Sequence, residues 1–318
     1  MREHHTPDGH RQGGRPQRRI SPALVLGLGI VAVSTASTFI RLAQAAVPSL
    51  ALAAWRLSFA TLMVAPLALT TSRQEWRRLG RRQWWLVIAS GIFLALHFYT
   101  WIASLAMTSV AASVALVSTN PLFVGLISHF ALQERLRPAT IVGMIVAVAG
   151  SAIIGISDLE AGSHQLLGDL LALVGALTVA VYLLIGRRLR GQLSLLAYIF
   201  PVYGTAALVL MVLSLVTRTP LLSYPPQMWL WLVLVALIPQ VIGHSSFNWA
   251  LGHLPATFVA LTVLAEPVGS TVLAWWVLEE TPTRVTVYGG LLILVGIAIA
   301  TWRRKADKNT IPKESLGL

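Results

Sequence analysis

Long apolar runs separated by short polar connections fill most of this sequence. Ten runs reach the length that an α-helix needs to cross the hydrocarbon core of a bilayer, about 20 residues. A helix is the form predicted for them, because a lone strand leaves its backbone groups without hydrogen bonds in lipid. The predicted spans are 21–40, 48–69, 84–105, 111–132, 139–156, 167–185, 195–216, 228–251, 256–278 and 285–302. The pattern therefore predicts an all-α polytopic membrane protein with ten transmembrane helices.

The composition agrees with this pattern. Only 11% of the 318 residues are charged and the mean hydropathy is +0.72, whereas soluble domains carry about 25% charged residues. The sequence has no cysteine, which excludes disulfides and thiolate metal sites. The net charge of +12 does not indicate a nucleic-acid partner, because the basic residues stand in short clusters between apolar runs.

The distribution of Lys and Arg predicts the orientation of the spans. With the N-terminus inside, 20 of the 24 basic residues fall in inner segments, and only Arg41, Arg218 and Arg284 fall in outer loops. Such an excess marks the cytoplasmic side. We therefore expect a multi-pass protein of the plasma membrane with both termini in the cytoplasm. The segments 1–20 and 303–318 are then basic cytoplasmic tails that contact anionic lipid headgroups.

One pattern of residues occurs twice. "PLFVGLISHFALQE" (121–134) and "PVGSTVLAWWVLEE" (267–280) both begin with proline and end with glutamate, at an offset of 146 residues. Gly143 and Gly150 match Gly289 and Gly296 at the same offset. The match of His97 to His244 needs one residue of slippage.

The duplication divides the chain into repeats at 21–156 and 167–302, each with five predicted spans. Because five is an odd number, the second repeat enters the membrane from the opposite side. Inverted-topology repeats are common in secondary transporters, whose substrate site lies where the repeats meet near the midplane of the bilayer.

With these motifs the sequence resembles the drug/metabolite transporter superfamily, specifically its EamA-type ten-helix members. The resemblance rests on the doubled Pro–Glu pattern and on three stretches: "NPLFVGLISHFALQERL" (120–136), "LAEPVGSTVLAWWVLEETPT" (264–283) and "GDLLALVGALTVAVYLLIGRRL" (168–189). It implies two inverted five-helix repeats around a central cavity, with both termini inside. It also implies movement of small metabolites, often the export of amino acids or related compounds.

Two polar residues precede the repeated prolines in mid-span. Glu266 is a candidate ligand for a substrate amine or a carrier of a coupling proton, since an ionisable side chain within a span usually faces a cavity or a partner. The alternative is a structural glutamate that braces the two halves. Its counterpart Asn120 would bind a polar ligand or satisfy a carbonyl freed by the proline. Pro121 and Pro267 are predicted to kink their helices.

Three further ionisable residues lie within predicted spans. His97 and His244 are candidates for proton relay or for contact with a carboxylate, against the alternative of hydrogen-bonded core residues. Arg56 is a candidate ligand for an anionic substrate group, or else a structural partner of Glu266. Two histidines alone provide no metal-site spacing, so no metal is predicted.

The remaining predictions concern cavity walls, packing and helix ends. Four residues whose side chains carry a polar group are candidates for the cavity wall: Trp101, Tyr182, Asn248 and Trp249. The glycines at 143, 150, 289 and 296 recur every two turns and are predicted to pack helices closely. At helix ends, Asp169 is read as a first-turn residue of its helix, and Glu134 and Glu280 are read as interfacial residues that order loops, Glu280 with Arg284.

Together these observations predict a secondary transporter of small polar metabolites, more an exporter than an importer, that works by alternating access. The sequence has no G-x-x-x-x-G-K-[ST] motif for ATP. Transport would therefore be driven by an ion gradient, with protons as the first candidate ion, or be purely facilitated. We predict no enzyme activity, no cofactor and no nucleic-acid partner. The alternatives are a membrane-embedded enzyme for lipid-like substrates and a non-transporting scaffold or sensor.

Overall fold

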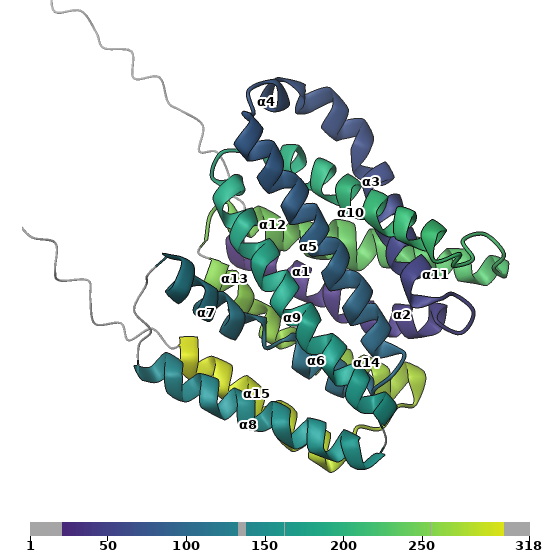
Figure 1. The fold of residues 1–318 in the computed structure, drawn as a ribbon, viewed down its shortest axis with the longest axis vertical. Coiled ribbons are helices and arrows are strands. Elements are labelled where there is room, and N and C mark those ends of the chain that lie inside the picture. The colour runs from purple at the N-terminus through teal and green to yellow at the C-terminus, as the bar shows by residue number, and fades with distance from the viewer. Residues whose placement is uncertain (1–20, 133–137, 162, 255, 302–318) are drawn as a thin grey trace, which may run out of the picture.

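The computed structural model describes residues 21–132, 138–161, 163–254 and 256–301, and this part of the chain contains helices and their connections only (Figure 1). The predicted tails, Glu134 and the last residue of the tenth span lie outside the described residues. Helix is present in each of the ten predicted spans.

The first repeat contains a regular series of helices with two interruptions. One lies at Thr35, between α1 and α2, and the other at Ser118 and Thr119, between α6 and α7. The helices are α1 (Pro22–Ser34), α2 (Ala36–Ala43), α3 (Ser49–Thr71), α4 (Arg73–Arg77), α5 (Arg81–Leu105), α6 (Val110–Val117), α7 (Asn120–Leu132) and α8 (Pro138–Ala161).

The second repeat has a corresponding series, with two segments of irregular helix. A π-helix, η1, lies between α11 and α12, and a 3₁₀ turn, η2, lies between α13 and α14. The elements are α9 (Ser163–Arg190), α10 (Leu195–Val216), α11 (Pro226–Val235), η1 (Ala236–His244), α12 (Ser245–Leu251), α13 (Ala256–Thr262), η2 (Val263–Ala265), α14 (Glu266–Leu278) and α15 (Arg284–Thr301).

By length and composition, seven helical segments of the described chain are suited to cross a membrane. They are Pro22–Ala43, Ser49–Thr71, Arg81–Leu105, Val110–Ile127, Ser163–Arg190, Leu195–Val216 and Pro226–Leu251. The apolar parts of α8 and α15 are shorter, at Ile141–Ile154 and Arg284–Gly296. The ninth predicted span is divided among α13, η2 and α14, so no one of its helices has the required length.

The outside of the bundle is apolar, as expected for a surface in contact with lipid. Leu24, Phe130 and Trp276 are 71%, 77% and 77% exposed, whereas soluble monomers rarely expose large contiguous apolar patches. The interior contains many alanines, among them the fully buried Ala51, Ala53 and Ala54 of α3. Small residues let helices approach closely where lipid removes the hydrophobic driving force between them.

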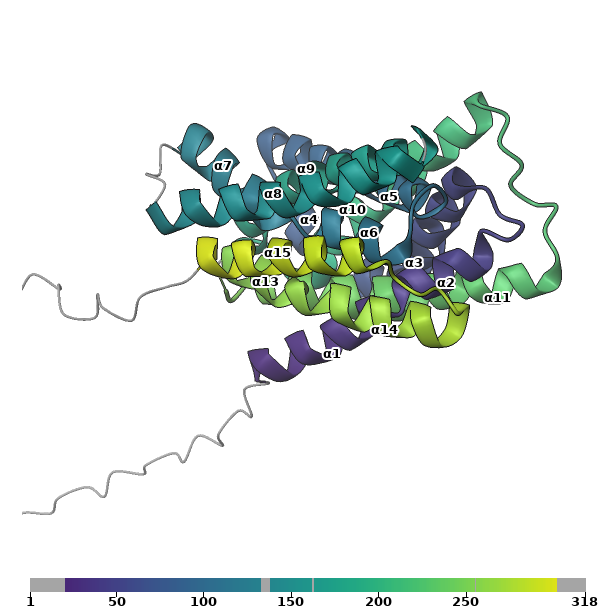
Figure 2. The same ribbon diagram turned by 90° about the horizontal axis from the view of Figure 1, so that it is seen from below.

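The two repeats pack against each other through corresponding helices. In the first repeat α3 packs on α10 of the second, and α8 packs on α15 along one edge of the bundle (Figure 1). The contact of α5 with α9 has its counterpart, with the repeats exchanged, in the contact of α1 with η1 and α12. The described chain enters through α1 and leaves through α15 at the same end of the bundle (Figure 2).

Glycines form the closest contact between α8 and α15. A methyl group on Gly150 would lie 2.6 Å from the carbonyl oxygen of Gly289, and one on Gly296 would lie 2.6 Å from the carbonyl oxygen of Gly143. The two backbones are therefore in direct contact at both places. Since Gly150 meets Gly289 while Gly143 meets Gly296, the two helices run antiparallel.

Candidate functional site

Two equivalent helices are interrupted at the repeated prolines. Pro121 is the second residue of α7 and Pro267 is the second residue of α14. Proline lacks the backbone N–H of an interior helical hydrogen bond and its ring clashes with the carbonyl four residues earlier, so the first turn is the part of a helix that accommodates it best. The sequence predicted kinks here. The structure has local interruptions here, a turn at Ser118 and Thr119 before α7 and the 3₁₀ segment η2 before α14, and these two helices begin at Asn120 and Glu266.

A cavity lies between these two breaks. Its volume is about 50 Å³, enough for a few water molecules and too little for a metabolite. Its lining residues come from α5, α6, α7 and the connection between these last two, and from α9, η1, α12, η2 and α14. They are His97, Trp101, Val117, Ser118, Asn120, Val179, Tyr182, Leu183, His244, Phe247, Asn248, Val263 and Glu266. Both repeats therefore contribute to one cavity, whose mostly apolar wall carries several polar groups.

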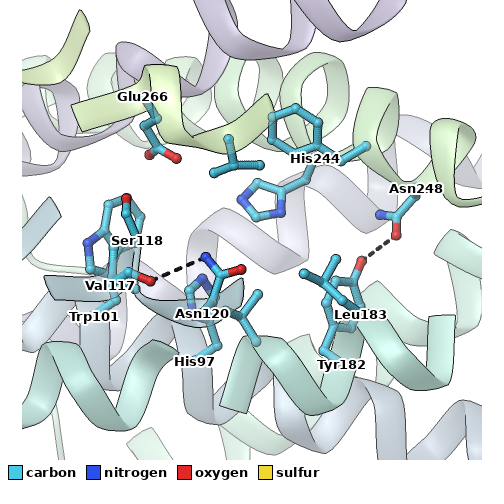
Figure 3. Close-up of a pocket in the computed structure, with 13 residues that line it drawn as sticks. His97, Trp101, Val117, Ser118, Asn120, Tyr182, Leu183, His244, Asn248 and Glu266 are labelled. Carbon is cyan, nitrogen blue, oxygen red and sulfur yellow. Dashed lines mark hydrogen bonds between the residues drawn. The ribbon is translucent and has the colours of Figure 1, made fainter. Parts of the chain in front are cut away.

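Glu266 and Asn120 line the cavity from opposite repeats (Figure 3). Glu266 is only 9% exposed. The amide Nδ2 of Asn120 donates to the carbonyl oxygen of Val117 at 3.3 Å, which satisfies a carbonyl at the helix break. The amide oxygen of Asn120 is buried and accepts no hydrogen bond. Asn120 thus bonds the freed carbonyl, as the structural alternative predicted, and its role toward a ligand stays a prediction.

The two histidines meet in the cavity. Their ring centroids are 6.3 Å apart, and Figure 3 shows both rings directed toward the space below Glu266. The Nδ1 of His97 is 2.9 Å from the carbonyl oxygen of Gly175. Because a carbonyl only accepts, Nδ1 carries the proton, which leaves Nε2 of the neutral ring as an acceptor. His97 is therefore both a hydrogen-bonded core residue and a cavity residue.

A network of hydroxyl and amide groups forms the opposite wall. The Tyr182 hydroxyl donates to Oδ1 of Asn248 at 2.7 Å, and Nδ2 of Asn248 donates to the Tyr203 hydroxyl at 3.4 Å. Nε of Arg190 donates to the carbonyl oxygen of Asn248 at 2.9 Å. These bonds fix Asn248 from both its side chain and its backbone. Tyr182 and Asn248 are thus brought together as the sequence analysis expected of cavity walls.

Arg56 lies beside the cavity and does not line it. It is fully buried, and its Nε donates a hydrogen bond of 2.8 Å to Oε1 of Gln240. Its charge also interacts with Glu266, the partner considered from the sequence, without direct contact between the two groups. The guanidinium carbon lies 4.0 Å from the centroid of the Phe98 ring, within cation–π range. Its two terminal nitrogens are buried and have no hydrogen-bond partner in the structure.

We expect Gln240→Met to destabilise the protein. The change removes the acceptor from Nε of a fully buried arginine, and a buried donor left unsatisfied costs about 1–3 kcal/mol. Thermal unfolding of the purified protein in detergent measures the loss. The matched control is Gln192→Met, which removes an exposed hydrogen bond of the same 2.8 Å length between Gln83 and Gln192. An equal loss of stability in both variants would contradict the special cost assigned to the buried pair.

The sequence analysis did not identify several residues of the cavity lining, nor Gln240, the hydrogen-bond partner of Arg56. Ser118 had a visible signal, because "STN" (118–120) is a polar group directly before a mid-span proline. Gln240 had a weaker one, as a lone amide in an apolar run. The apolar residues of the lining, such as Val179 and Phe247, resemble all other span residues and have no signal.

Two expectations from the sequence are wrong. Trp249 does not line the cavity: its ring stacks on His253 with centroids 4.2 Å apart. Asp169 is not in the first turn of its helix, because α9 begins at Ser163, and it is buried at 3% exposure. Within the described residues, no group of three His, Asp or Glu side chains could hold a metal ion.

Comparison with known proteins shows the family of this chain. The EamA-like transporter family matches residues 21–156 and 166–302, one match for each repeat. The chain belongs to the EamA-like transporter family. The resemblance found from the doubled Pro–Glu pattern is thereby confirmed.

Relatives of this EamA-like transporter are also described as transporters. An uncharacterized transporter of Archaeoglobus fulgidus is 27% identical over 88% of this chain and 99% of its own. The uncharacterized transporter YxxF of Bacillus subtilis is 23% identical over 82% of this chain and 84% of its own. A crystal structure of another protein has a TM-score of 0.65 at 22% identity, and covers 88% of this chain and 96% of that chain. This last similarity shows the fold alone.

Family membership and the apolar helices together indicate a multi-pass membrane protein with a transporter role. In this EamA-like transporter, the residues predicted for the cavity fall into two groups. Those that the structure brings to one space are Glu266, His97, Asn120, His244, Trp101, Tyr182 and Asn248, whereas Arg56 lies behind its wall.

Proposed function

We propose that this EamA-like protein is a secondary transporter of small polar metabolites, such as amino acids or related compounds, and that it exports them across the plasma membrane by alternating access. Ten membrane-crossing helices form two repeats of inverted topology, with both termini in the cytoplasm. The observation that carries the proposal is the cavity at the two equivalent helix interruptions, which is lined by residues of both repeats and includes several polar side chains.

The glycine contacts support the inverted topology. At the offset of 146, Gly143 corresponds to Gly289 and Gly150 to Gly296. When each glycine is replaced by its counterpart in the other repeat, the contact of Gly150 with Gly289 becomes the contact of Gly296 with Gly143. The structure shows both contacts. Such reciprocal contacts are the property of a two-fold axis. Because the two helices run antiparallel, that axis is perpendicular to them, so for helices that cross a membrane it lies in the membrane plane.

The broken helices support a substrate site at the cavity. In secondary transporters, discontinuous helices form the binding site at the interface of the repeats, and the N-termini of the half-helices attract anionic groups. Here α7 and α14 both begin at the cavity. The present volume of about 50 Å³ holds only water, so the cavity must widen for a metabolite to bind.

The chemistry of the lining indicates the class of substrate. Glu266 provides a carboxylate for an amine, and the amide oxygen of Asn120 provides an acceptor for a polar hydrogen. Trp101 and Phe247 provide apolar surface for the body of a small molecule. Glu266 and the two histidines also provide groups that exchange protons, so a proton gradient is the proposed source of energy.

Counterflow in liposomes tests the proposal. Liposomes with the purified protein are loaded with one unlabelled metabolite at high concentration, and a trace of the same labelled compound is added outside. A carrier accumulates the label transiently, whereas protein-free liposomes do not. A panel of amino acids, related amines and carboxylic acids identifies the substrate. The proposal fails if no compound accumulates in liposomes whose protein unfolds cooperatively on heating and is therefore folded.

A further inference from the structure

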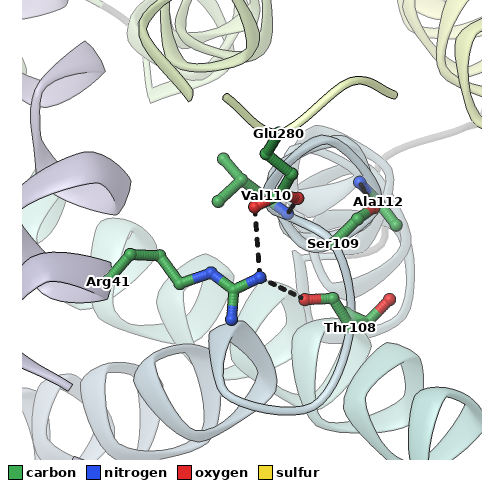
Figure 4. Close-up of polar contacts among 6 residues, drawn as sticks. All are labelled: Arg41, Thr108, Ser109, Val110, Ala112 and Glu280. Carbon is green, nitrogen blue, oxygen red and sulfur yellow. Dashed lines mark hydrogen bonds and ion pairs between the residues drawn. The ribbon is translucent and has the colours of Figure 1, made fainter. Parts of the chain in front are cut away.

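One ion pair joins the two repeats outside the cavity lining (Figure 4). A terminal nitrogen of Arg41 lies 3.1 Å from Oε2 of Glu280, and the two side chains are 29% and 22% exposed. The same nitrogen is 3.5 Å from the carbonyl oxygen of Thr108.

Glu280 has a second role at the start of a helix. Its Oε1 accepts a hydrogen bond of 2.6 Å from the backbone N–H of Val110, the first residue of α6. Helix N-termini have unsatisfied N–H groups and a partial positive charge, so a carboxylate there is stabilising. The sequence predicted Arg284 as the loop partner of Glu280. The structure instead shows Arg41, which is 239 residues away along the chain.

These bonds connect three elements at one end of the bundle. Arg41 is in the last turn of α2, Val110 begins α6, and Glu280 follows the end of α14. The first two elements belong to the first repeat and the third belongs to the second. In Figure 2, α2 and the end of α14 lie toward the end of the bundle opposite the one where the described chain begins and finishes. In the proposed topology this is the outer side of the membrane.

Helix α6 connects this ion pair to the cavity. Its first residue, Val110, donates to Glu280, and its last residue, Val117, lines the cavity. The two positions are about 10 Å apart along the helix axis. A separation of the repeats at Glu280 therefore releases the N-terminus of the helix whose other end forms the cavity wall.

We propose that Arg41, Glu280 and the N–H of Val110 form an outer latch, which closes the cavity on the side opposite the termini and separates when the cavity opens to that side. The direction of this motion, in which the cavity opens to the outer side of the membrane, rests on the proposed function. The latch joins the repeats where alternating access requires them to part. Its partial exposure keeps the ion pair weak enough to break in every cycle, while the charge-assisted bond to Val110 adds to its strength.

Accessibility of a single cysteine measures the latch. The natural sequence has no cysteine, so Ser118→Cys places one thiol in the cavity lining of an otherwise thiol-free protein. Ser118 is buried and its hydroxyl makes no hydrogen bond in the structure, so the change removes none. The rate of labelling by a membrane-impermeant thiol reagent, added to intact cells from outside, reports the opening of the cavity to that side.

We expect Glu280→Gln to raise this labelling rate by about fivefold to tenfold, because the neutral amide loses the ion pair and the charge at α6. Arg41→Gln is expected to raise it by less, since it leaves the bond of Glu280 to Val110. The matched control is Glu279→Gln, which neutralises the adjacent exposed carboxylate and is expected to leave the rate unchanged. An unchanged rate in Glu280→Gln and Arg41→Gln, or an equal rise in Glu279→Gln, would overturn the latch.

A cross-link gives a second measurement that does not depend on the folding of these variants. In Arg41→Cys/Glu280→Cys, a short cleavable bifunctional thiol reagent should hold the latch closed and stop counterflow by at least about tenfold, and a reductant should restore it. Unchanged counterflow in the cross-linked protein would overturn the latch although transport itself is intact. By contrast, absence of counterflow for every metabolite in the unmodified protein overturns the proposed function, and the labelling assay still decides the latch.

Discussion

Glu266→Gln is expected to abolish transport driven by a proton gradient. The glutamine fits the same volume but neither ionises nor attracts an ammonium group as a carboxylate does. Loss of one partner of a buried charge pair costs about 2–5 kcal/mol, which corresponds to a reduction of about 30-fold to more than a thousandfold. Initial rates of uptake into liposomes, with and without an imposed pH gradient, measure the effect once a substrate is identified by counterflow.

Two assays on the same variant separate the roles considered for Glu266. If the carboxylate binds a substrate amine, both counterflow and gradient-driven uptake are lost. If it only carries the coupling proton, counterflow is retained because exchange needs no net proton movement. If it only braces the two repeats, both kinds of transport are retained and the midpoint of thermal unfolding falls. The last result would contradict the site proposed here.

The control for this experiment is Glu279→Gln. Glu279 is exposed and follows the end of α14, the helix that begins with Glu266. The same change of charge and volume is thus made at the other end of the same helix. Transport by Glu279→Gln should equal that of the natural protein. A comparable loss in both variants would mean that the effect comes from total charge and not from the cavity.

Much of the fold could be predicted because its signals are local or periodic. Apolar runs of sufficient length indicate helices wherever they occur, and the Pro–Glu pattern repeated at 146 residues identified the two repeats. The cavity residues that were predicted are polar groups in apolar runs, where they stand out. Glu266 and Asn120 also precede prolines, which weaken the helix at that point and so place both residues at its break.

Other features could not be predicted because they depend on which helices meet. Nothing near Arg56 in the sequence indicates Gln240, which lies 184 residues away. Likewise the partner of Glu280 was expected four residues along the chain, at Arg284, and lies across the repeat interface at Arg41. Local spacing favours the nearest opposite charge, whereas packing selects the one that the fold brings close.

The one-residue slippage between the repeats has a structural counterpart. His97 lies in the regular helix α5, whereas His244 ends the π-helix η1. A π-helix is a wider turn with i→i+5 hydrogen bonds, so it accommodates an extra residue without ending the helix. The sequence showed the extra residue as a mismatch in the alignment. The structure shows that the wider turn also includes Gln240, the partner of Arg56.

The contact of α8 with α15 leads to a second large effect, on stability. Gly150→Ala should destabilise the protein, because the added methyl group would lie 2.6 Å from the carbonyl oxygen of Gly289 and 2.9 Å from the backbone nitrogen of Ile293. Backbone atoms cannot move aside as a side chain does, so the helices must separate. Overpacking of this kind costs about 1–3 kcal/mol. Thermal unfolding in detergent measures the change.

The control reverses the sign of the expected effect. Gly27 lies in α1 with nothing within 4 Å of an added methyl group. Alanine is favoured over glycine in a helix by about 1 kcal/mol, so Gly27→Ala should leave stability unchanged or raise it. Gly150→Ala loses stability although it has the same intrinsic gain. A fall of the same size in both variants would indicate a general effect of alanine and would contradict close packing at Gly150.

A double variant tests whether the two repeats share this contact. Gly289→Ala places a methyl group 2.9 Å from the carbonyl oxygen of Gly150, so it forces apart the same pair of helices at the same point. Once one methyl group has separated them, the second has more room. The combined loss in Gly150→Ala/Gly289→Ala should therefore be smaller than the sum of the single losses, as is usual for residues in contact. Gly150→Ala/Gly27→Ala should be additive, since these positions lie in different helices and share no partner among the atoms that their methyl groups would meet.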